Sequence, residues 1–552
     1  MNSDPEASSN VATCRLWTWR SYRFRVAVAL ALALTIEGLM RSNINMAMVC
    51  MVNRTAVDAI ARQSSPAVTA LPITLANETF LHQIMDNGTL HKCDYDDEIV
   101  FRSRWAMKKA ALNRHRGGEL IITKPHQALI FTSFYLGGLF IVIPGSYLVD
   151  RFGSKNVVLI GAVINVIGTF ITPIVASTLH AYALVFLRFI MGCGQGILVP
   201  CMNVLIAHWF PPTERSTAIA VSTTGNQLSV IAAMFLTAEL CQFNFLGGWP
   251  LAFHSYGIIG VAFCIFWAMS VYNSPSKAKK ISDCEIQHIQ QSIHSISVRK
   301  LSPKDVPWTK ILTSPTLWSI ALNSFSQNFM TVGTITYIPS YYQTVLRMDL
   351  SSNGVMSAMP FVIQLLTKIL FAGGADYLRR NNIMTHTRVT KLFNMIAALG
   401  SGLCYFLLTF CDCKDETWAI ILVISAVGLS SGFIPGYNTS MVCVAPRYTS
   451  SVASFCRLFG QIAAVASPYM IGWIVQKGTR DEWNIAFYVI AIVLLSCGLA
   501  FQLFGSASVQ DWAKTPTPAS DMSKNSMNTT LIAPTETDEV KTITCDLNND
   551  MK

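Results

Sequence analysis

Charged residues are scarce in this sequence, and the motifs of soluble enzymes are missing from it. Of its 552 residues, 13% are Asp, Glu, Lys or Arg and 52% are hydrophobic. A soluble fold cannot bury that much apolar surface, so the composition excludes a soluble globular protein. No Walker pattern, GxSxG elbow or Cys/His metal spacing stands in a polar segment. These absences argue against an ATP-driven pump and an enzyme, and they predict no metal site.

The net charge of +10 does not indicate a nucleic-acid partner. Much of the positive charge lies in short segments between apolar runs, where membrane orientation explains it. The fifteen cysteines lie mostly within apolar runs, where a thiol behaves as a small hydrophobe. Cys93, Cys411 and Cys413 fall in polar loops instead, which leaves a disulfide through Cys93 open.

Apolar runs long enough to cross a bilayer, roughly 20 residues each, recur along the whole chain. They cover residues 26–52, 126–149, 155–177, 181–206, 215–240, 250–272, 314–342, 354–376, 388–410, 417–436, 449–475 and 484–505. A polar linker, 273–312, separates the first six runs from the last six. The sequence therefore predicts an all-α membrane protein with twelve transmembrane helices in two six-helix halves, 26–272 and 313–505.

The flanking segments predict the orientation. The N-terminal tail, 1–25, ends in an arginine cluster, which favours a cytoplasmic location. The polar tail 506–552 is expected to be disordered and cytoplasmic. The loop 53–124 carries three N-glycosylation patterns, which begin at Asn53, Asn77 and Asn87, so we expect it to face the outside or a lumen.

A short charged turn follows the second span of each half. The turn in the first half contains Asp150, Arg151 and Lys155, and the corresponding turn in the second half contains Asp376 and Arg379. The first turn resembles the signature of the major facilitator superfamily, with Ser146 where that family usually has glycine. This resemblance implies a major facilitator fold and a conformational latch made of these five residues. Ordinary positive-inside charge is the alternative reading.

A second resemblance covers most of the chain outside the tails and the long loop. Its blocks are Arg41-Ser-Asn43-Ile-Asn45, Trp209-Phe-Pro211-Pro212, Gly248-Trp249-Pro250, Pro307-Trp308-Thr-Lys310, Asn353-Gly354-Val-Met-Ser357 and Ala445-Pro446-Arg447-Tyr448. In this order they resemble solute carrier family seventeen, which includes type I sodium/phosphate cotransporters, sialin and vesicular glutamate transporters. The resemblance implies an anion carrier coupled to a cation gradient.

Three departures from that family pattern bear on substrate and coupling. Phe131, Gln327 and Gln195 stand where the vesicular glutamate branch has a histidine, an arginine and an acid, so such a carrier is not expected. Because the fourth span lacks its acid, sodium-coupled, chloride-sensitive or potential-driven transport is favoured over strict proton symport.

Charges inside apolar runs are costly, so each one carries a functional hypothesis. They are Glu37, Arg41, Arg188, Lys368 and Arg457. Four of the five are cationic, which favours an anionic substrate; the alternative for the long side chains is that they reach the membrane surface.

Helical spacing groups some of these residues. Glu37 and Arg41 are four residues apart and share a helix face, so they form either a structural ion pair or a substrate arginine with its coupling acid. Arg188 and Gln195 are seven residues apart, again on one face, where a guanidinium fork and an amide suit an oxygen-rich anion.

The resulting hypothesis is a secondary active transporter that works by alternating access. Its substrate-binding residues are Arg41, Arg188, Gln195, Lys368 and Arg457, its coupling residue is Glu37, and its partners are a small anionic substrate and the lipid bilayer. It needs no cofactor beyond a co-transported sodium ion or proton. Plasma and vesicle membranes are both compatible with the sequence, and a non-transporting solute receptor is the alternative.

Overall fold

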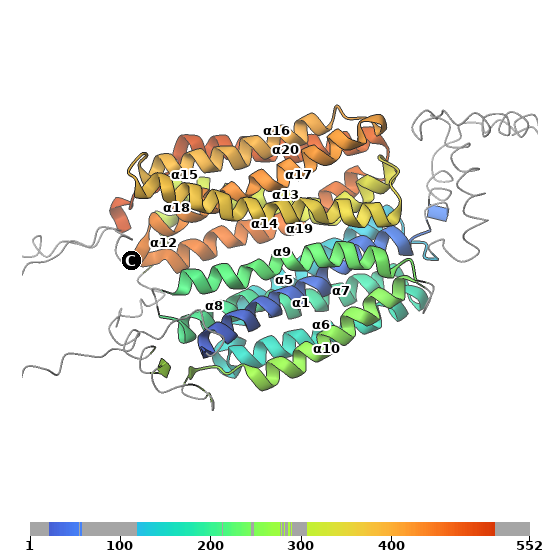
Figure 1. Cartoon of the computed structure of the whole chain (residues 1–552), viewed down its shortest axis with the longest axis horizontal. Helices are drawn as coiled ribbons and strands as arrows, with labels where there is room; N and C mark the ends of the chain where they lie inside the picture. The colour runs from blue at the N-terminus through green and yellow to red at the C-terminus, as the bar shows by residue number, and fades with distance from the viewer. Residues whose placement is uncertain are drawn as a thin grey trace, which may run out of the picture.

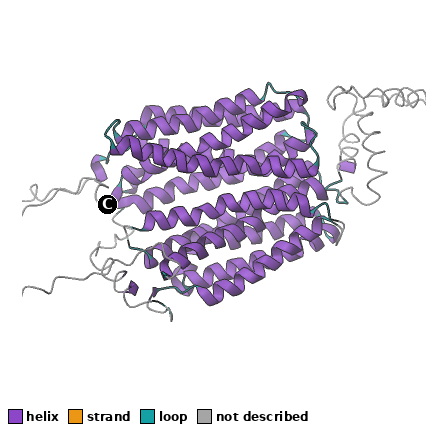
Figure 2. Cartoon of the chain, in the orientation of Figure 1, coloured by secondary structure: helices purple, strands orange, loops and turns teal. Residues whose placement is uncertain are grey.

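The computed structural model describes residues 21–53, 56–57, 119–211, 214–243, 248–275 and 306–513, together with the linker positions 278, 281, 285, 286 and 289. The regular structure within these residues is helical (Figure 2), and one isolated β-bridge joins Val52 to Leu120. The predictions for Asn77, Asn87 and Cys93, and for the tail beyond residue 513, fall outside the described residues.

Residues 22–270 form the first set of helices, which we call the N-terminal group. It consists of α1 (Tyr22–Met51), α5 (Lys124–Phe152), α6 (Ser154–Thr178), α7 (Ala181–Gly196), α8 (Leu198–Trp209), α9 (Arg215–Leu240) and α10 (Trp249–Ser270). Only Ile197 separates α7 from α8, and its backbone is in the right-handed helical region, so the two act as one rod.

Residues 308–504 form the second set, the C-terminal group. It consists of α12 (Trp308–Thr313), α13 (Pro315–Thr344), α14 (Leu350–Arg380), α15 (His386–Met395), α16 (Ser401–Leu408), α17 (Glu416–Leu429), α18 (Thr439–Cys443), α19 (Thr449–Ile474) and α20 (Arg480–Phe504). The π-helical turn η4 (Ile396–Gly400) joins α15 to α16, and the turns η6 (Ser430–Phe433) and η7 (Ile434–Asn438) join α17 to α18.

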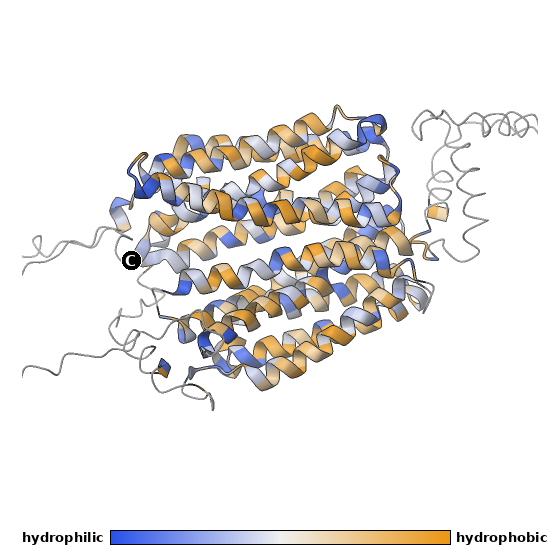
Figure 3. Cartoon of the chain, viewed as in Figure 1, coloured by the Kyte–Doolittle hydropathy of each residue, from blue (hydrophilic) through white to orange (hydrophobic). Residues whose placement is uncertain are grey.

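The two groups lie side by side with their helices nearly aligned (Figure 1). The helix ends lie at two faces. We call the face with the Asp150 turn the Asp150 end, and the opposite face, where α10 begins, the Trp249 end. Hydrophilic residues gather at both faces, and orange, hydrophobic residues dominate the length of the helices between them (Figure 3), as expected for a bundle surrounded by lipid.

Nine helical segments of the described chain are long and apolar enough to span a membrane. Three further helices, α1, α13 and α19, are as long (26 to 30 residues) but are not among the nine. They carry polar residues such as Glu37, Asn323 and Arg457, which lower their hydropathy. The twelve-helix arrangement therefore remains a prediction.

Glycines allow the helices to pack closely within the N-terminal group. A Cβ atom at Gly225 of α9 would overlap the backbone carbonyl of Ala31 in α1. A Cβ atom at Gly192 of α7 would overlap the carbonyl of Phe134 in α5. Small residues at such crossings let membrane helices approach until their backbones touch, so α1 with α9 and α5 with α7 form tightly packed pairs.

Contacts between the two groups concentrate toward the Trp249 end. There, Ser351 of α14 donates a hydrogen bond to Glu239 of α9 (2.6 Å), and the Gln343 amide donates to the carbonyl of Val49 (3.4 Å). Nearer the Asp150 end, Lys368 of α14 lies 3.5 Å from the Thr223 hydroxyl of α9. The described residues thus join the two groups most firmly at the Trp249 end.

A disulfide joins Cys50, at the end of α1, to Cys241, just after α9, with their Cα atoms 6.5 Å apart. No pattern in the sequence indicates this pairing, because both cysteines border apolar runs and 191 residues separate them. Cys413 is also disulfide-bonded, whereas Cys411 is free. The expectation that cysteines in apolar runs act only as small hydrophobes is therefore wrong for Cys50 and Cys241.

Candidate functional site

Arg188 lies in the interior of the N-terminal group. Its side chain is 2% exposed, so the alternative reading, in which it reaches the membrane surface, is wrong in this structure. Nη2 donates to the backbone carbonyl of Arg41 (2.9 Å), and the guanidinium carbon lies 4.8 Å from the centre of the Phe134 ring. Nε and Nη1 are buried without a hydrogen-bond partner. A buried guanidinium with free donors is suited to bind an anion.

Local packing places the Arg188 guanidinium against the Phe134 ring. Gly192 follows Arg188 by one helical turn and lies against the Phe134 backbone carbonyl. Because α5 and α7 touch at this glycine, the Phe134 side chain is held beside the arginine. A cation against an aromatic face is stabilised by about 0.5–2 kcal/mol, which offsets part of the cost of burying the charge.

Glu37 and Arg41 do not pair, although they lie one turn apart on α1. No ion pair with an N–O distance of 4.0 Å or less joins them among the described residues, and Glu37 Oε2 and Arg41 Nε are both buried without hydrogen-bond partners. Glu37 is 2% exposed, whereas Arg41 is half-buried. The structural ion-pair reading is therefore wrong for this conformation, and both groups retain unused hydrogen-bonding capacity.

Asn43 is a buried polar residue that sequence reasoning missed. Its side chain is fully buried, two residues beyond Arg41, and neither its amide oxygen nor its amide nitrogen has a hydrogen-bond partner. Buried polar atoms are nearly always paired in proteins. Its only signal in the sequence is an asparagine inside an apolar run, which is easily mistaken for a structural residue.

Gln195 lies seven residues after Arg188, near the junction of α7 and α8. Its side chain is half-buried, and its Oε1 atom has no hydrogen-bond partner. Seven residues place it about 10 Å from Arg188 along the helix axis, toward the Asp150 end. Arg188, Arg41 and Gln195 together form what we call the central site.

The two predicted basic residues of the C-terminal group occupy different surroundings. Lys368 is half-buried at the seam between the groups, beside Thr223. Arg457 of α19 is exposed although it lies well inside the helix. The structure therefore does not bring Lys368 and Arg457 into direct hydrogen-bond contact with Arg41 or Arg188 among the described residues.

One face of α19 is exposed and polar. Ser450, Ser454 and Arg457 are exposed and Gln461 is half-buried, and their spacing of three or four residues places them on one helix face. The exposed apolar residues of the same helix lie on a different face: Leu458, Ile462, Tyr469 and Trp473. The apolar face suits contact with lipid, and the polar face does not.

The predicted latch residues make contacts within each group. Lys155 donates to the Ala268 carbonyl of α10 (2.7 Å), and Arg151 donates to the hydroxyl of Tyr147 (3.3 Å). Arg379 lies 3.6 Å from Asp376 and donates to the Pro435 carbonyl (3.2 Å).

None of these latch contacts joins the two groups. The Asp150 side chain lies outside what the structure describes. A latch that closes the Asp150 end thus stays a prediction for another conformation.

Asn53 is the one predicted glycosylation residue that the structure describes. It is half-buried next to the Val52–Leu120 bridge, and its side-chain oxygen accepts a hydrogen bond from the Ala56 amide (3.2 Å). It lies at the Trp249 end, as α1 ends at Met51. Modification of this residue remains a prediction.

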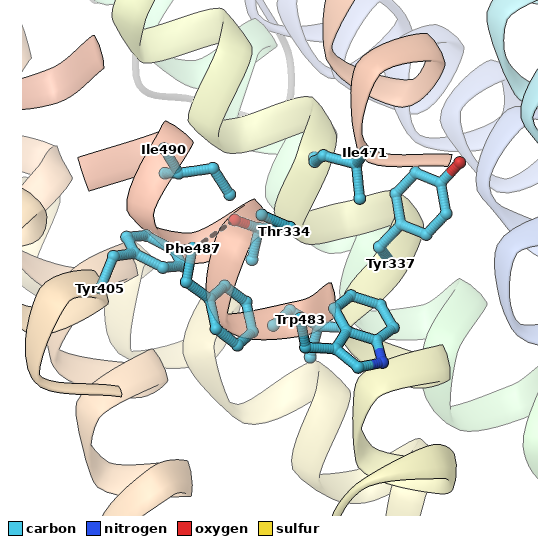
Figure 4. Close-up of a pocket in the computed structure, with 10 residues that line it drawn as sticks. Thr334, Tyr337, Tyr405, Ile471, Trp483, Phe487 and Ile490 are labelled. Carbon is cyan, nitrogen blue, oxygen red and sulfur yellow. Dashed lines mark hydrogen bonds between the residues drawn. The ribbon is translucent and has the colours of Figure 1, made fainter. Parts of the chain in front are cut away.

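A small cavity inside the C-terminal group is separate from the predicted site. Figure 4 shows it between Tyr337 of α13, Ile471 of α19 and Trp483 of α20, with a hydrogen bond between Thr334 and Tyr405 on one side. None of the residues that line it is one of the predicted binding residues. Its walls are mainly apolar, so it does not suit a small hydrophilic anion.

Comparisons with known proteins agree with this geometry. The model of the Major Facilitator Superfamily matches residues 30–468. The chain is 30% identical over 482 residues to the uncharacterised transporter slc-17.3 of Caenorhabditis elegans, covering 86% of each chain. It is 29% identical to sodium-dependent phosphate transport protein 3 of Mus musculus, covering 70% of this chain and 80% of that protein.

A solved structure gives independent support for the fold. The crystal structure of a D-xylose-proton symporter superposes with a TM-score of 0.59 at 14% identity, covering 88% of this chain and 99% of that one. At this identity the likeness concerns the fold alone. Together with the family match and the sequence relatives, it shows that this chain belongs to the Major Facilitator Superfamily and, within it, to solute carrier family seventeen.

Proposed function

We propose that this protein is a secondary active transporter that moves a small organic or inorganic anion across a membrane by alternating access. The observation that carries the proposal is the central site. Arg188 is buried with two unpaired donor atoms, and its third nitrogen contacts the backbone of Arg41, whose own Nε is unpaired. An anion with several oxygens would satisfy these donors and offset the cost of burying the charges.

The proposed architecture is twelve transmembrane helices in two six-helix halves. The N-terminal and C-terminal groups correspond to these halves, and α1, α13 and α19 supply the three spans beyond the nine apolar segments. Contacts that bridge the groups near the Trp249 end support a conformation in which the substrate path is closed there and open toward the Asp150 end. Rocking of one half against the other would reverse this arrangement.

Transport is proposed to be coupled to a cation gradient or to the membrane potential, with Glu37 as the coupling residue. Glu37 is buried beside the central site, and no ion pair neutralises it in the described residues. Gln195 stands at the position of the fourth span where related carriers are expected to have an acidic residue. Its absence favours transport driven by sodium or by the membrane potential over strict proton symport. The name of the mouse relative, sodium-dependent phosphate transport protein 3, supports coupling to sodium.

We infer that the Trp249 end faces the cell exterior or a lumen, with both termini cytoplasmic. The Cys50–Cys241 disulfide lies at the Trp249 end, and disulfides persist in oxidising compartments rather than in the cytosol. The glycosylation pattern at Asn53 lies at the same end. Both features agree with the positive charge on the N-terminal tail.

The test is uptake of labelled anions into liposomes that contain the purified protein. Phosphate, glutamate, sialate and urate would be offered separately, each under an imposed sodium, proton or voltage gradient. Saturable uptake of one anion that is lost in Arg188→Ala supports the proposal. Uptake of that anion at an unchanged rate in Arg188→Ala contradicts the assigned site, and absence of uptake of all four contradicts the substrate class.

A further inference from the structure

We propose that the protein binds a sodium ion in the C-terminal group, at a cluster of oxygen atoms where α14 meets the end of α17 and the turn η6. Four oxygens make up this group, which we call the Thr367 cluster: the hydroxyls of Thr367 and Ser431 and the backbone carbonyls of Gln364 and Gly428. The inference rests on the proposed function, since it gives the co-transported cation a place in the fold.

Short distances between oxygen atoms are the first observation. The Thr367 hydroxyl oxygen lies 2.8 Å from the Ser431 hydroxyl oxygen and 2.9 Å from the Gly428 carbonyl oxygen. The Gln364 carbonyl oxygen lies 3.2 Å from the Thr367 hydroxyl and 3.1 Å from the Ser431 hydroxyl. Oxygens from two separate helical segments therefore meet in one compact group.

The cluster contains fewer protons than short oxygen contacts. The hydroxyls of Thr367 and Ser431 carry one proton each, and backbone carbonyl groups carry none. The Thr367 hydroxyl also lies 3.0 Å from the Ile363 carbonyl, so two protons serve five oxygen–oxygen contacts of 3.2 Å or less. Oxygen atoms that approach without a proton between them repel each other, and a cation placed among them turns this repulsion into attraction.

The backbone supplies a second reason for a cation at this place. The helix α17 ends at Leu429, inside the predicted span 417–436, and the tighter 3₁₀ turn η6 follows it. The Gly428 carbonyl lies in the last turn of α17, where the helix dipole has its negative end. In secondary transporters, helices that are interrupted within the membrane present such carbonyl groups to sodium ions.

Helix packing explains why these oxygens meet. A Cβ atom at Gly428 would lie 3.3 Å from the Ile363 Cγ2 atom, so the glycine lets α14 approach the backbone of α17. A Cβ atom at Gly432 of η6 would lie 2.6 Å from the Phe393 carbonyl of α15. The turn is thus packed against both α14 and α15, which holds the Ser431 hydroxyl beside α14.

The chemistry of the ligands favours a monovalent ion. No carboxylate accepts a hydrogen bond from Thr367 or Ser431 within the described residues. Sites for Ca²⁺ and Mg²⁺ use carboxylates, because a divalent ion inside a protein needs compensating charge. Lys368, the next residue of α14, reaches the Thr223 hydroxyl of α9 (3.5 Å), so its ammonium group extends to a different helix. Hydroxyl and carbonyl oxygens alone suit a sodium ion.

The cluster lies deep within the bundle and apart from Glu37. Thr367 is 13 residues before Arg380, the last residue of α14, which corresponds to roughly 20 Å from that helix end. Ser431 is buried, whereas Thr367 is half-buried. Glu37 belongs to α1 in the N-terminal group, so the cluster is a second cation position.

The location links the cation to the movement of the two groups. Ser351 and Lys368, both on α14, contact α9 of the N-terminal group. A sodium ion that ties α14 to η6 therefore acts on the helix that separates from α9 when the Trp249 end opens. Since a ligand shifts an equilibrium only through different affinities for its two states, we expect the sodium affinity to differ between the two conformations.

Thermal unfolding of the purified full-length protein tests this inference, with sodium chloride replaced by N-methyl-D-glucamine chloride at constant ionic strength. Sodium alone, without any transported anion, should raise the melting temperature of wild type and saturate, because a ligand of the folded state stabilises it. Potassium at the same concentration should have a smaller effect. Equilibrium binding of radioactive sodium measures the site directly.

Matched variants locate the ion. Thr367→Val keeps the shape of the side chain and removes its oxygen, so the half-saturating sodium concentration should rise at least about tenfold. Ser431→Ala should have a similar effect, whereas Thr367→Ser retains the oxygen and should stay within about threefold of wild type. Ser401→Ala is the control: it removes another buried hydroxyl, which donates to the Ala426 carbonyl of α17 (2.6 Å), and should leave the sodium affinity unchanged. Elution volume checks that each variant is folded.

The outcomes distinguish this inference from the proposed function. Equal sodium affinities in wild type and Thr367→Val would overturn the Thr367 cluster, and so would an equal loss in Ser401→Ala. Loss of sodium binding in Glu37→Gln but not in Thr367→Val would assign the ion to Glu37 and overturn the cluster. Wild type that neither binds sodium nor is stabilised by it would also overturn the cluster, while anion uptake driven by voltage or by protons would leave the proposed function intact.

Discussion

At the scale of single residues, the protein contains buried charges that their neighbours only partly satisfy. Arg188 combines a carbonyl partner, an aromatic face and two unpaired nitrogens, and Glu37 has an unpaired oxygen. An unpaired buried polar group costs about 1–3 kcal/mol, and more when it is charged. A protein can retain such unpaired atoms where the binding of a ligand offsets their free-energy cost. We therefore expect substrate and cation to bind at these atoms.

Replacing Arg188 tests the central site most directly. Arg188→Gln should lower transport efficiency roughly 10- to 100-fold, because the charged donors are lost. Arg188→Lys should fall between this variant and wild type, since an ammonium cannot reproduce the planar fork or the contact with Phe134. Arg480→Gln serves as control, because the Arg480–Asp412 pair is partly exposed and contributes little. Equal loss in the control variant would contradict the assignment.

Replacing Glu37 separates coupling from binding. Glu37→Gln keeps the size of the side chain and removes its charge. We expect anion exchange between the two sides of a liposome to persist, while accumulation driven by an ion gradient falls at least about tenfold. Labelled anion flux, measured with and without unlabelled anion inside, distinguishes the two modes. Full gradient-driven accumulation in this variant would show that another group couples the cation.

At the scale of helices, glycines determine which pairs pack closely, and one linker residue fastens the start of α1. Gly225 brings α9 against α1, and Gly192 brings α7 against α5. Glu285 of the linker accepts hydrogen bonds from the backbone amides of Tyr22 and Arg23 (3.0 Å each) and from the Ser21 hydroxyl (2.7 Å). Its carboxylate caps the amide groups at the beginning of α1.

A matched pair of glycine substitutions measures the close packing. Gly225→Ala should destabilise the protein by roughly 1–3 kcal/mol, because the new methyl group overlaps the Ala31 carbonyl and the helices must separate. Gly373→Ala is the control: nothing lies within 4 Å of its Cβ position, so the substitution should be neutral or stabilise the helix by about 0.5–1 kcal/mol. Thermal unfolding in detergent measures both, and equal melting temperatures would refute the packing argument.

The linker contact should depend on pH. Burial alone would raise the pKa of Glu285, but hydrogen bonds from Arg23, Ser21 and Tyr22 outweigh it and lower the pKa below its usual range. The contact therefore stabilises the protein fully above the pKa of a free glutamate, about 4.3, and this stabilisation is lost as the pH falls through the lower pKa of the folded state.

Comparison with an uncharged variant tests this dependence. Glu285→Gln should melt at a lower temperature than wild type at pH 7, by an amount equivalent to about 1.5–3 kcal/mol. The difference should shrink as the pH falls below the pKa of a free glutamate, about 4.3, and through the lower pKa of the folded state. Asp481→Asn, at an exposed position, is the control and should show no such convergence. A difference that stays constant down to pH 3 would contradict the assigned role.

At the scale of the whole molecule, side-chain hydrogen bonds in the described structure connect the two groups of helices near the Trp249 end. Ser351–Glu239 and Gln343–Val49 connect them there. The proposed alternating access requires these bonds to break each time that end opens. Transport should therefore depend on separating α9 from α14.

A cross-link tests that requirement. With cysteines in place of Glu239 and Ser351, a short thiol-reactive cross-linker should reduce transport at least about tenfold, and cleaving the linker should restore it, since a covalent bond holds the Trp249 end closed. The control pair replaces Thr387 and Ser508, whose hydroxyls lie 3.4 Å apart within the C-terminal group. Wild type treated with the same reagent reports the effect of its native cysteines. Unaffected transport after complete cross-linking at 239 and 351 would contradict the rocking motion.

The sequence alone located the helices well, because crossing a bilayer demands a long uninterrupted apolar run. The predicted run 155–177 corresponds to α6 (Ser154–Thr178). The run 354–376 is shorter than α14 (Leu350–Arg380). That helix continues because Asp349 caps its first turn and polar residues extend the helix beyond the hydrocarbon layer.

The sequence also indicated the family through its blocks of residues, and it predicted an anionic substrate, because intramembrane charges are few and their cost makes each one informative. What only the tertiary structure decided is which distant residues meet: Arg188 with the Arg41 carbonyl and Phe134, Cys50 with Cys241, and Tyr437 with Gln327. Spacing along one helix predicts a shared face, but contacts between helices depend on how closely each pair packs and on the break at Gly436. Which side chains meet across helices is therefore decided by the packing of the whole bundle, because no local sequence pattern specifies how closely two distant helices approach.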